Sequence, residues 1–265
     1  MGSASKQALV AAQAALKAAG SKATLGVAEE LFAADRALAA SAQLRATLAD
    51  PAIAPKAKDE LIKKVFGRKL SATSAGLLGK IVAQRWSNQD DLLAGIEDVA
   101  IRAAAKTAGA KADVVAEIFA FARAVASDAD LELALGSKLG EPEAKAKVVV
   151  KLIGKKADKS TVAIISALVQ QPRGRRIGKL LAQAAATVAE SKGAVVATVT
   201  SATPLAAAQA SALTKSVGGL YGADVIINSV IDENVVGGLR VQVGDDIIDG
   251  SVATRLHDLR LALVG

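Results

Sequence analysis

The segment VAEELFAADRALAASAQLRATL, residues 27–48, returns in altered form 87 residues later as VVAEIFAFARAVASDADLELAL, residues 114–135. Between residues 27–67 and 114–154, 15 of 41 positions are identical without a gap, and ten of these identities are not alanine. The matched positions include Phe, Arg, Pro and Gly, which a chance alignment of two alanine-rich helices would not bring into register. The chain therefore contains an internal duplication.

Each copy has the pattern of a helical bundle. An apolar face recurs with helical period in the first copy, at Val27, Leu31, Ala34 and Leu38. Pro55 and its counterpart Pro142 suit the first turn of the next helix, where a missing N–H costs nothing. Gly67 is placed to end that helix, and Ser71 and Ser87 are candidate N-caps for the last two helices of the first copy.

Only the first copy is preceded by an extra amphipathic helix, at roughly Ser5 to Ala19. The first copy can therefore close a bundle of about six helices. The second copy has nothing comparable before Val114 except the end of the first copy. It must borrow a helix or leave one face open.

The last segment changes to the period of strands. AVVATVTSA (Ala194–Ala202) and VIINSVI (Val225–Ile231) are rich in β-branched residues and predict two strands. Between them, Thr203 is expected to cap a helix that starts at Pro204 and ends at Gly218-Gly219.

A hairpin and a final helix are expected to complete this segment. Leu239–Val243 and Asp246–Asp249 flank a turn at Gly244-Asp245. The expected last helix carries leucines on one face, at Leu256, Leu259 and Leu263. The predicted fold class is α+β, mostly α, with two tandem helical bundles (1–109 and 110–194) followed by a small α/β domain (195–265).

Composition limits the possible partners. Hydrophobic residues make up 52% of the chain but aromatics only 2%, so the cores consist mainly of Ala, Leu, Val and Ile. The absence of cysteine excludes disulfides and thiolate metal sites. A net charge of +7 favours acidic partners, which include nucleic acid, anionic lipid and acidic protein surfaces. The few scattered aromatic residues argue against a stacking platform for single strands.

Neither a signal peptide nor a membrane span is expected. MGSASKQALV lacks an apolar h-region, and no stretch reaches the roughly 18 uninterrupted apolar residues that span a bilayer. If the chain works at a membrane, a partner carries it there.

The glycine- and aspartate-rich stretch near the C-terminus could cradle a phosphate, bind a metal or only fold. Gly237 and Gly238 lie between strands with the wrong spacing for a dinucleotide fingerprint, and no GxxxxGK[ST] occurs. Asp245, Asp246 and Asp249 could hold a divalent cation, but such aspartates more often serve turns and helix starts. The turn interpretation is favoured over the metal site.

Other candidate sites are weaker. His257 is the only histidine and has no nucleophile near it in the pattern, while Ser251 lacks a GxSxG context and suits an early helical turn. An enzyme is therefore not favoured. The basic stretch QPRGRRIGK, residues 171–179, could contact phosphates, but without a groove-entry motif a solvated loop is favoured.

The run DENVVGGLRVQVGDDIIDGSVATRLHDLRLAL, residues 232–263, resembles the C-terminal domain of the F-type ATP synthase delta subunit family. The mitochondrial counterpart of that family is the oligomycin-sensitivity-conferring protein. The carrying pattern is an acidic residue before Gly-Gly, an alternating strand, Gly-Asp, then Asp-x-Ser and a leucine-patterned helix. VTSATPL, residues 199–205, precedes it, and residues 30–67 resemble the family's N-terminal helical domain. The resemblance covers essentially the whole chain, with the helical part counted twice.

The resemblance implies a non-catalytic subunit without a cofactor. Such a subunit belongs to the peripheral stalk at the cytoplasmic face of the membrane, where it resists rotor torque. It implies that a helical bundle receives the N-terminal helix of an alpha subunit, and that residues 195–265 hold the C-terminal helices of b. The glycines, aspartates and serine of the C-terminal motif then shape its fold, at Gly237, Gly238, Gly244, Asp245, Asp249 and Ser251.

The duplication departs from the usual family member. It leaves open which bundle receives the alpha helix. Residues 1–109 are preferred, because only they carry the extra first helix. The alternative function is a basic, Ala/Lys-rich nucleic-acid-binding protein, although no nucleic-acid partner is expected under the stalk interpretation.

Overall fold

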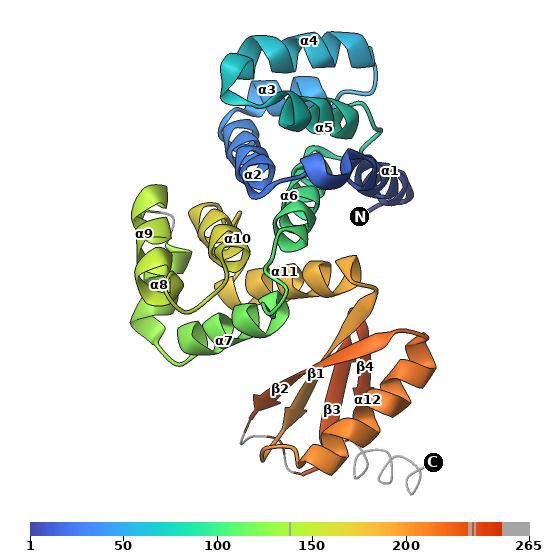
Figure 1. Cartoon of the computed structure of the whole chain (residues 1–265), viewed down its shortest axis with the longest axis vertical. Coiled ribbons are helices and arrows are strands. Elements are labelled where there is room, and N and C mark those ends of the chain that lie inside the picture. Colours follow the sequence, from blue (N-terminus) through green and yellow to red (C-terminus); the bar gives the residue numbers. More distant parts are fainter. Residues whose placement is uncertain (138, 233–234, 236, 251–265) are drawn as a thin grey trace, which may run out of the picture. The chain divides into compact units, whose positions relative to one another are not determined.

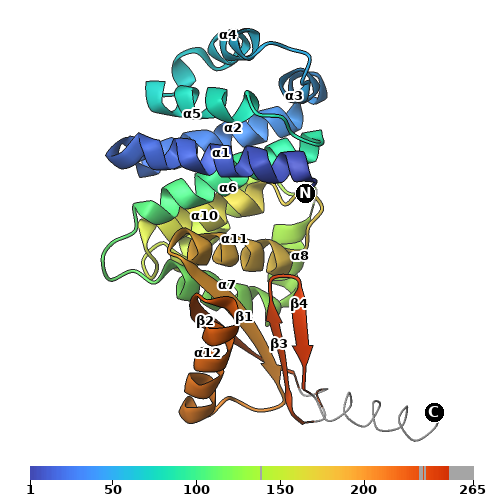
Figure 2. The same ribbon diagram turned by 90° about the vertical axis from the view of Figure 1, so that its right-hand side faces the viewer.

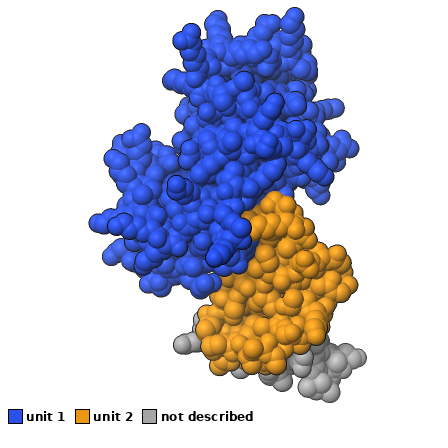
Figure 3. Space-filling view, viewed as in Figure 1, with its two compact units in different colours: residues 1–187 blue, residues 188–265 orange. Residues whose placement is uncertain are grey.

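The computed structural model describes every residue except 138, 233–234, 236 and 251–265. The chain forms two compact units, residues 1–187 and 188–265, which Figure 3 shows in two colours. Both helical copies lie in the first unit. The helix α11 (Ile177–Ser191) runs from the first unit into the second.

The helices of the two copies follow one another in the same order (Figure 1). The first copy comprises α1 (Ser3–Ala19), α2 (Leu25–Ala40), α3 (Ala42–Ala49), α4 (Pro55–Phe66), α5 (Ala72–Val82) and α6 (Gln89–Lys106), with short 3-10 turns at Gly20–Lys22 and Gly67–Lys69. The second copy comprises α7 (Val114–Ala126), α8 (Ala129–Gly136), α9 (Pro142–Ile153), α10 (Lys159–Gln170) and α11.

Helix boundaries repeat with the spacing of the sequence. The helices α8 and α9 begin and end 87 residues after α3 and α4, and α10 begins 87 residues after α5. The prolines stand in the first turns of α4 and α9, as the sequence predicts. Two further predictions are confirmed: Gly67 ends α4 with φ of 52°, and the side chain of Ser71 caps α5. Ser87 is not a cap: the side chain of Asn88 caps α6, while Ser87 donates its N–H to Ser5.

The cores repeat as well. In both copies the inward faces are filled by aliphatic side chains and one phenylalanine at matched positions. The matched, fully packed pairs are Leu31 and Ile118, Phe32 and Phe119, Leu48 and Leu135, Ile62 and Val149, and Leu78 and Ile165. Each copy therefore buries the same apolar stripe, which is the main stabilising contribution to such bundles.

The second copy has no counterpart of α1, and helices of the first copy pack in its place. In the first copy α1 packs on α5 and α6. In the second copy α10, the counterpart of α5, packs on α6 and on α2 (Figure 2). Of the two alternatives that the sequence left open, a borrowed helix or an open face, the contacts of α10 correspond to the borrowed helix, and the helix shared by both copies is α6.

The second unit contains a four-stranded sheet in the order β2-β1-β3-β4. Its strands are β1 (Ala194–Ser201), β2 (Asp224–Ile231), β3 (Leu239–Val243) and β4 (Asp246–Asp249). The strands β1 and β2 are parallel, whereas β3 pairs antiparallel with both β1 and β4. The helix α12 (Ala207–Tyr221) packs along one face, over a core formed by Ala197, Val199, Val217, Val241 and Val243.

The expected limits of α12 were wrong at both ends. It starts at Ala207 and not at Pro204, and Thr203 does not cap it, since the Thr203 carbonyl accepts the hydroxyl of Ser201 instead. It also continues past Gly218-Gly219 to Tyr221 and ends at Gly222, which has φ of 63°. A Cβ on Gly218 would lie 3.3 Å from the carbonyl oxygen of Ala223 and 3.7 Å from Val225 of β2, so this glycine serves the close packing of α12 on the chain that follows it rather than the end of the helix.

Candidate functional site

The hairpin of the C-terminal motif has the predicted geometry. Val243 and Asp246 are opposite each other in the β3–β4 ladder, so Gly244 and Asp245 form a two-residue turn. Gly244 has φ of 59°, whereas Asp245 stays at negative φ, which is the pattern of a type II′ turn with glycine at its first central position. Gly244 is therefore required by the backbone of the turn.

The paired glycines before β3 act through their backbone angles. Gly237 and Gly238 have φ of 71° and 81°, values that residues with a Cβ seldom adopt. Both are exposed, and their positive φ is a backbone reason for glycine at these two positions.

The described contacts of the motif's aspartates lie within the second unit. Asp246 accepts a hydrogen bond of 3.0 Å from the hydroxyl of Tyr221, which ties β4 to the end of α12. Asp249 ends β4 opposite Arg240. Among the described residues, no three or more His, Asp or Glu side chains come together as metal ligands. Ser251, His257 and the expected last helix lie outside the described residues.

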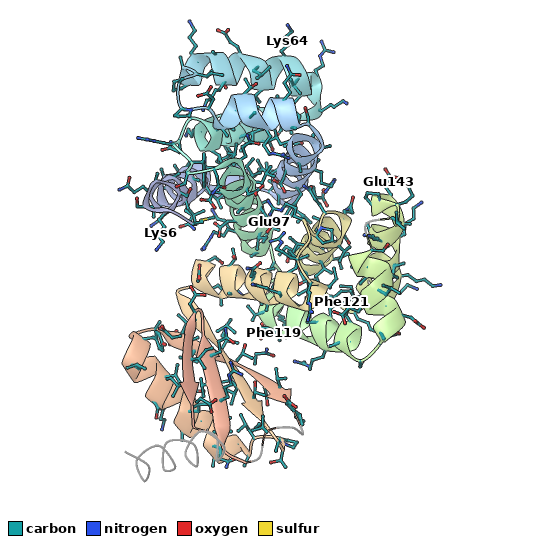
Figure 4. The ribbon with its side chains drawn as sticks, turned by 180° about the vertical axis from the view of Figure 1, so that it is seen from behind. Lys6, Lys64, Glu97, Phe119, Phe121 and Glu143 are labelled. Carbon is teal, nitrogen blue, oxygen red and sulfur yellow. The ribbon has the colours of Figure 1, made fainter. Side chains whose placement is uncertain are left out.

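The basic loop between α10 and α11 is not the solvated loop that the sequence favoured. Arg175 binds the carboxylate of Glu97 through both terminal guanidinium nitrogens, with two distances of 2.7 Å, and Arg173 forms a further ion pair with it. Glu97 belongs to α6 and is only 8% exposed (Figure 4). Arg173 has φ of 52°, the one positive value among the described non-glycine residues. Such a backbone persists only where surrounding contacts hold it.

A second buried carboxylate lies beside these ion pairs. Asp35 on α2 is 4% exposed, and its Oδ1 has no hydrogen-bond partner. Burial raises the pKa of Asp35 to about 7, with the charge of Arg173 opposing this shift and that of Glu97 adding to it. We refer to Asp35, Glu97, Arg173 and Arg175 as the inter-repeat cluster.

The inter-repeat cluster was missed from the sequence, although one signal was present. Asp35 stands in the apolar stripe of α2, between Leu31 and Leu38, which are both fully buried. A carboxylate at such a position needs a partner or a proton. Nothing local in the chain indicates that its neighbours come from a loop about 140 residues away.

Comparisons with known proteins all match this chain to ATP synthase delta subunits. The sequence model of the ATP synthase delta (OSCP) subunit family matches residues 11–89 and 99–263. The ATP synthase subunit delta of Leifsonia xyli subsp. xyli is 52% identical over 265 residues, and the match covers the whole of both chains. That of Streptomyces avermitilis is 37% identical over 263 residues, covering 97% of this chain and 96% of the relative.

The chain belongs to the ATP synthase delta (OSCP) subunit family. Delta subunits are non-catalytic subunits of the peripheral stalk, so the enzyme interpretation is set aside. The comparisons give no support to the nucleic-acid-binding alternative. Over the described residues of this delta-family chain, no helix combines the length and apolar character needed to cross a bilayer.

The second repeat of this delta-family chain presents apolar surface around α8 and α9. Leu133 is 72% exposed and Leu139 is 97% exposed, and both line a groove of about 1030 Å³ between α8, the start of α9 and the α10–α11 loop. A second groove of about 830 Å³ runs between α7, α8 and α9. At the positions equivalent to Leu133 and Leu139, the first repeat has Ala46 and Ala52. The two repeats therefore share a fold but present different surfaces.

The sheet of the second unit also has apolar side chains on the face opposite α12. Val230 on β2 and Ile247 on β4 point to that face and are exposed. Val196 and Ile226, which lie opposite each other in β1 and β2, are half-buried on the same face. The sheet face opposite α12 therefore carries exposed as well as half-buried apolar side chains.

Proposed function

We propose that this chain links the catalytic head of the F-type ATP synthase to the membrane sector through the b subunit, on the cytoplasmic face of the membrane. In that position it resists the torque of the rotor during ATP synthesis. The observation that carries the proposal is the match of the family along nearly the whole chain, at 52% identity to an ATP synthase subunit delta over full length.

The proposal assigns one partner to each end of the chain. Residues 195–265 hold the C-terminal helices of b, and the exposed Val230 and Ile247 supply apolar anchors of the kind that helix recognition needs. Residues 1–109 receive the N-terminal helix of alpha. The extra helix α1, which packs on α5 and α6, supports the choice of the first bundle.

A competing site for the alpha helix lies in the second repeat. Its two grooves and the exposed Leu133 and Leu139 offer more apolar surface than the first repeat has at equivalent positions. The role of the second repeat is thus either a spacer or a second docking site for the head.

Recovery of partners from membranes tests the stalk assignment. Affinity-tagged full chain is expressed in its own cells, membranes are solubilised with mild detergent, and captured proteins are identified by mass spectrometry. We expect alpha and b subunits in amounts comparable to the bait. Capture of nucleic acid without ATP synthase subunits, with binding that falls steeply as salt is raised, would support the alternative.

Calorimetry with a synthetic peptide of the alpha N-terminus separates the two docking sites. We expect binding to the full chain and to residues 1–109, and weak or no binding to residues 110–194. Circular dichroism of each fragment is the control, because residues 110–194 lack the packing partner α6. In the full chain, Leu133→Glu with Leu139→Glu should leave binding unchanged. If this double variant abolishes binding, the second repeat takes the alpha helix.

A further inference from the structure

The inter-repeat cluster lies where the two helical repeats meet, and it contains two buried carboxylates. Glu97 is satisfied by both arginines of the α10–α11 loop, whereas Asp35 keeps an oxygen without a hydrogen bond. A buried carboxylate that lacks such a bond favours its neutral, protonated form. The contacts of the cluster thus depend on whether Asp35 carries a charge.

The surroundings of Asp35 have a mixed charge. Glu97 faces it from α6, Arg173 and Arg175 face it from the α10–α11 loop, and Arg36 follows it on α2. The helix α10 also packs on α2, and it carries no ionisable side chain from Ser160 to Gln170.

The other elements packed on α2 also carry charged groups, but these have other partners or lie in water. Arg45 on α3 is held by Gln89 and the carbonyl oxygen of Ala39. Lys80 on α5 is exposed. Removal of the proton from Asp35 therefore places a charge in a buried site where its Oδ1 has no hydrogen bond, and where Glu97 repels that charge while Arg173 attracts it.

The two repeats differ at the position of Asp35. The counterpart of Asp35 in the second repeat is Ala122, although the next residue is arginine in both copies. The helix fold thus does not need a carboxylate here. Its presence is specific to the helix on which the second repeat packs.

We propose that the inter-repeat cluster is a proton-dependent latch between the two helical repeats. With a proton on Asp35, α10 and the α10–α11 loop stay packed on α2 and α6. When the proton leaves, the added charge draws water into the contact and the second repeat loosens from the first. The latch changes how rigidly the two repeats are joined while each repeat stays folded.

The direction of the pH dependence follows from proton linkage. The raised pKa means that the closed latch binds the proton more tightly than the open one, in which Asp35 is solvated and titrates near its usual value of 3.8. Opening is then least favourable at the acid end. It becomes up to about tenfold more favourable per pH unit as the pH rises toward about 7, and it is constant above that.

Hydrogen exchange of the full chain tests the latch. Exchange of α6 and α10 amides is measured at about pH 5, 6, 7 and 8, with labelling times corrected for the intrinsic exchange rate. We expect protection of the facing segments to fall by about tenfold or more from pH 5 to 7 and then to level off. The outer helix α4 is the internal reference and should show no such trend.

Matched variants identify the responsible carboxylate. Asp35→Asn keeps the shape of the side chain without its charge, and Asp35→Ala installs the residue of the second repeat. Both should keep the acid-level protection at every pH. Glu29→Gln, which changes an exposed carboxylate on the same helix, should behave as the parent chain. The latch is refuted if the parent shows pH-independent protection, or if both Asp35 variants retain the parent's pH dependence.

A direct titration covers the case in which both Asp35 variants unfold. Carbon-13 labelling of aspartate carboxyl groups in the parent chain reports the pKa of Asp35 by NMR. A midpoint near 7 supports the latch, whereas a midpoint near 4 overturns it.

Discussion

Gly95 shows how a single missing side chain decides the packing of α6. Trp86 is buried in the first bundle and donates its indole N–H to the carbonyl oxygen of Ile81 at 2.9 Å. A Cβ on Gly95 would lie 2.1 Å from Cη2 of that ring, so the indole would have to move.

We expect Gly95→Ala to lower the free energy of unfolding by about 1–3 kcal/mol, the usual cost of overpacking. The measurement is urea unfolding of the full chain, followed by the fluorescence of Trp86, its only tryptophan. Gly76→Ala is the control. It lies in a helix with open space around its Cβ position, and it should stabilise the chain by about 0.5–1 kcal/mol. Equal effects of both substitutions would contradict the packing argument.

Gly238 carries the corresponding prediction for the second unit. Gly238→Val forces a β-branched residue to φ of about 81°, which costs about 1–3 kcal/mol. We expect faster hydrogen exchange in β3 and β4 and reduced recovery of b. Gly238→Asn should be milder, because asparagine tolerates positive φ. Normal exchange and full b recovery in Gly238→Val would show that the glycine pair is not needed.

At the scale of elements, a carboxylate in each repeat ties two helices together. Glu30 on α2 accepts the backbone N–H of Ser71 at the start of α5, at 2.7 Å. Its counterpart Glu117 on α7 accepts the N–H of Asp158 at the start of α10, at 3.0 Å. The same long-range hydrogen bond thus recurs in both copies, 87 residues apart.

This contact predicts an acid-dependent loss of stability. Burial pushes the pKa of Glu30 upward, but hydrogen bonds from Ser74 and Ser71 outweigh it, so the pKa lies below 4.5. A lowered pKa contributes stability that is present at neutral pH and is lost as the pH falls through the folded value. Glu30→Gln should be less stable than the parent at about pH 7, with a smaller further loss on acidification. Denaturant titrations at several pH values measure this, with the exposed Glu29→Gln as control. A difference between Glu30→Gln and the parent that stays constant with pH would rule it out.

At the scale of the whole molecule, the sharing of α6 joins the two repeats. The helix α6 supplies core residues such as Leu92 and Ile96 to the first bundle, and it also packs against α10. The second repeat therefore contributes to the stability of the first.

Deletion of residues 111–194 tests that contribution. It joins Ala110 to Val195 at repeat-equivalent positions and leaves 181 residues. The first bundle keeps its own core and should fold and still bind the alpha peptide. Its thermal unfolding should begin at a lower temperature than in the parent, because Asp35 and Glu97 lose the cover of the second repeat. In the assembled enzyme, coupling should suffer because the stalk attachment is displaced. An unchanged unfolding temperature would show that α10 does not support α6.

Local features of the fold were readable from the sequence. The prolines that open α4 and α9, the cap at Ser71, the end of α4 at Gly67 and the hairpin turn at Gly244 all depend on residues within a few positions of one another. Hydrogen bonds over such short spans are set by local backbone chemistry. The C-terminal limit of α12 was mispredicted because the sequence interpretation took Gly218 as a helix terminator. In the structure Gly218 lies inside the helix, where its small size allows close packing against β2.

The contacts between the repeats were decided by tertiary structure alone. Alignment of the two copies showed that the second copy lacks a first helix, but it did not show which helix takes that place. Once α6 takes that place, Glu97 and Asp35 are buried, and the basic loop is drawn onto Glu97 from 78 residues away at Arg175. The physical reason is that a buried carboxylate requires partners wherever they lie in the chain, and only the packed structure brings them within reach.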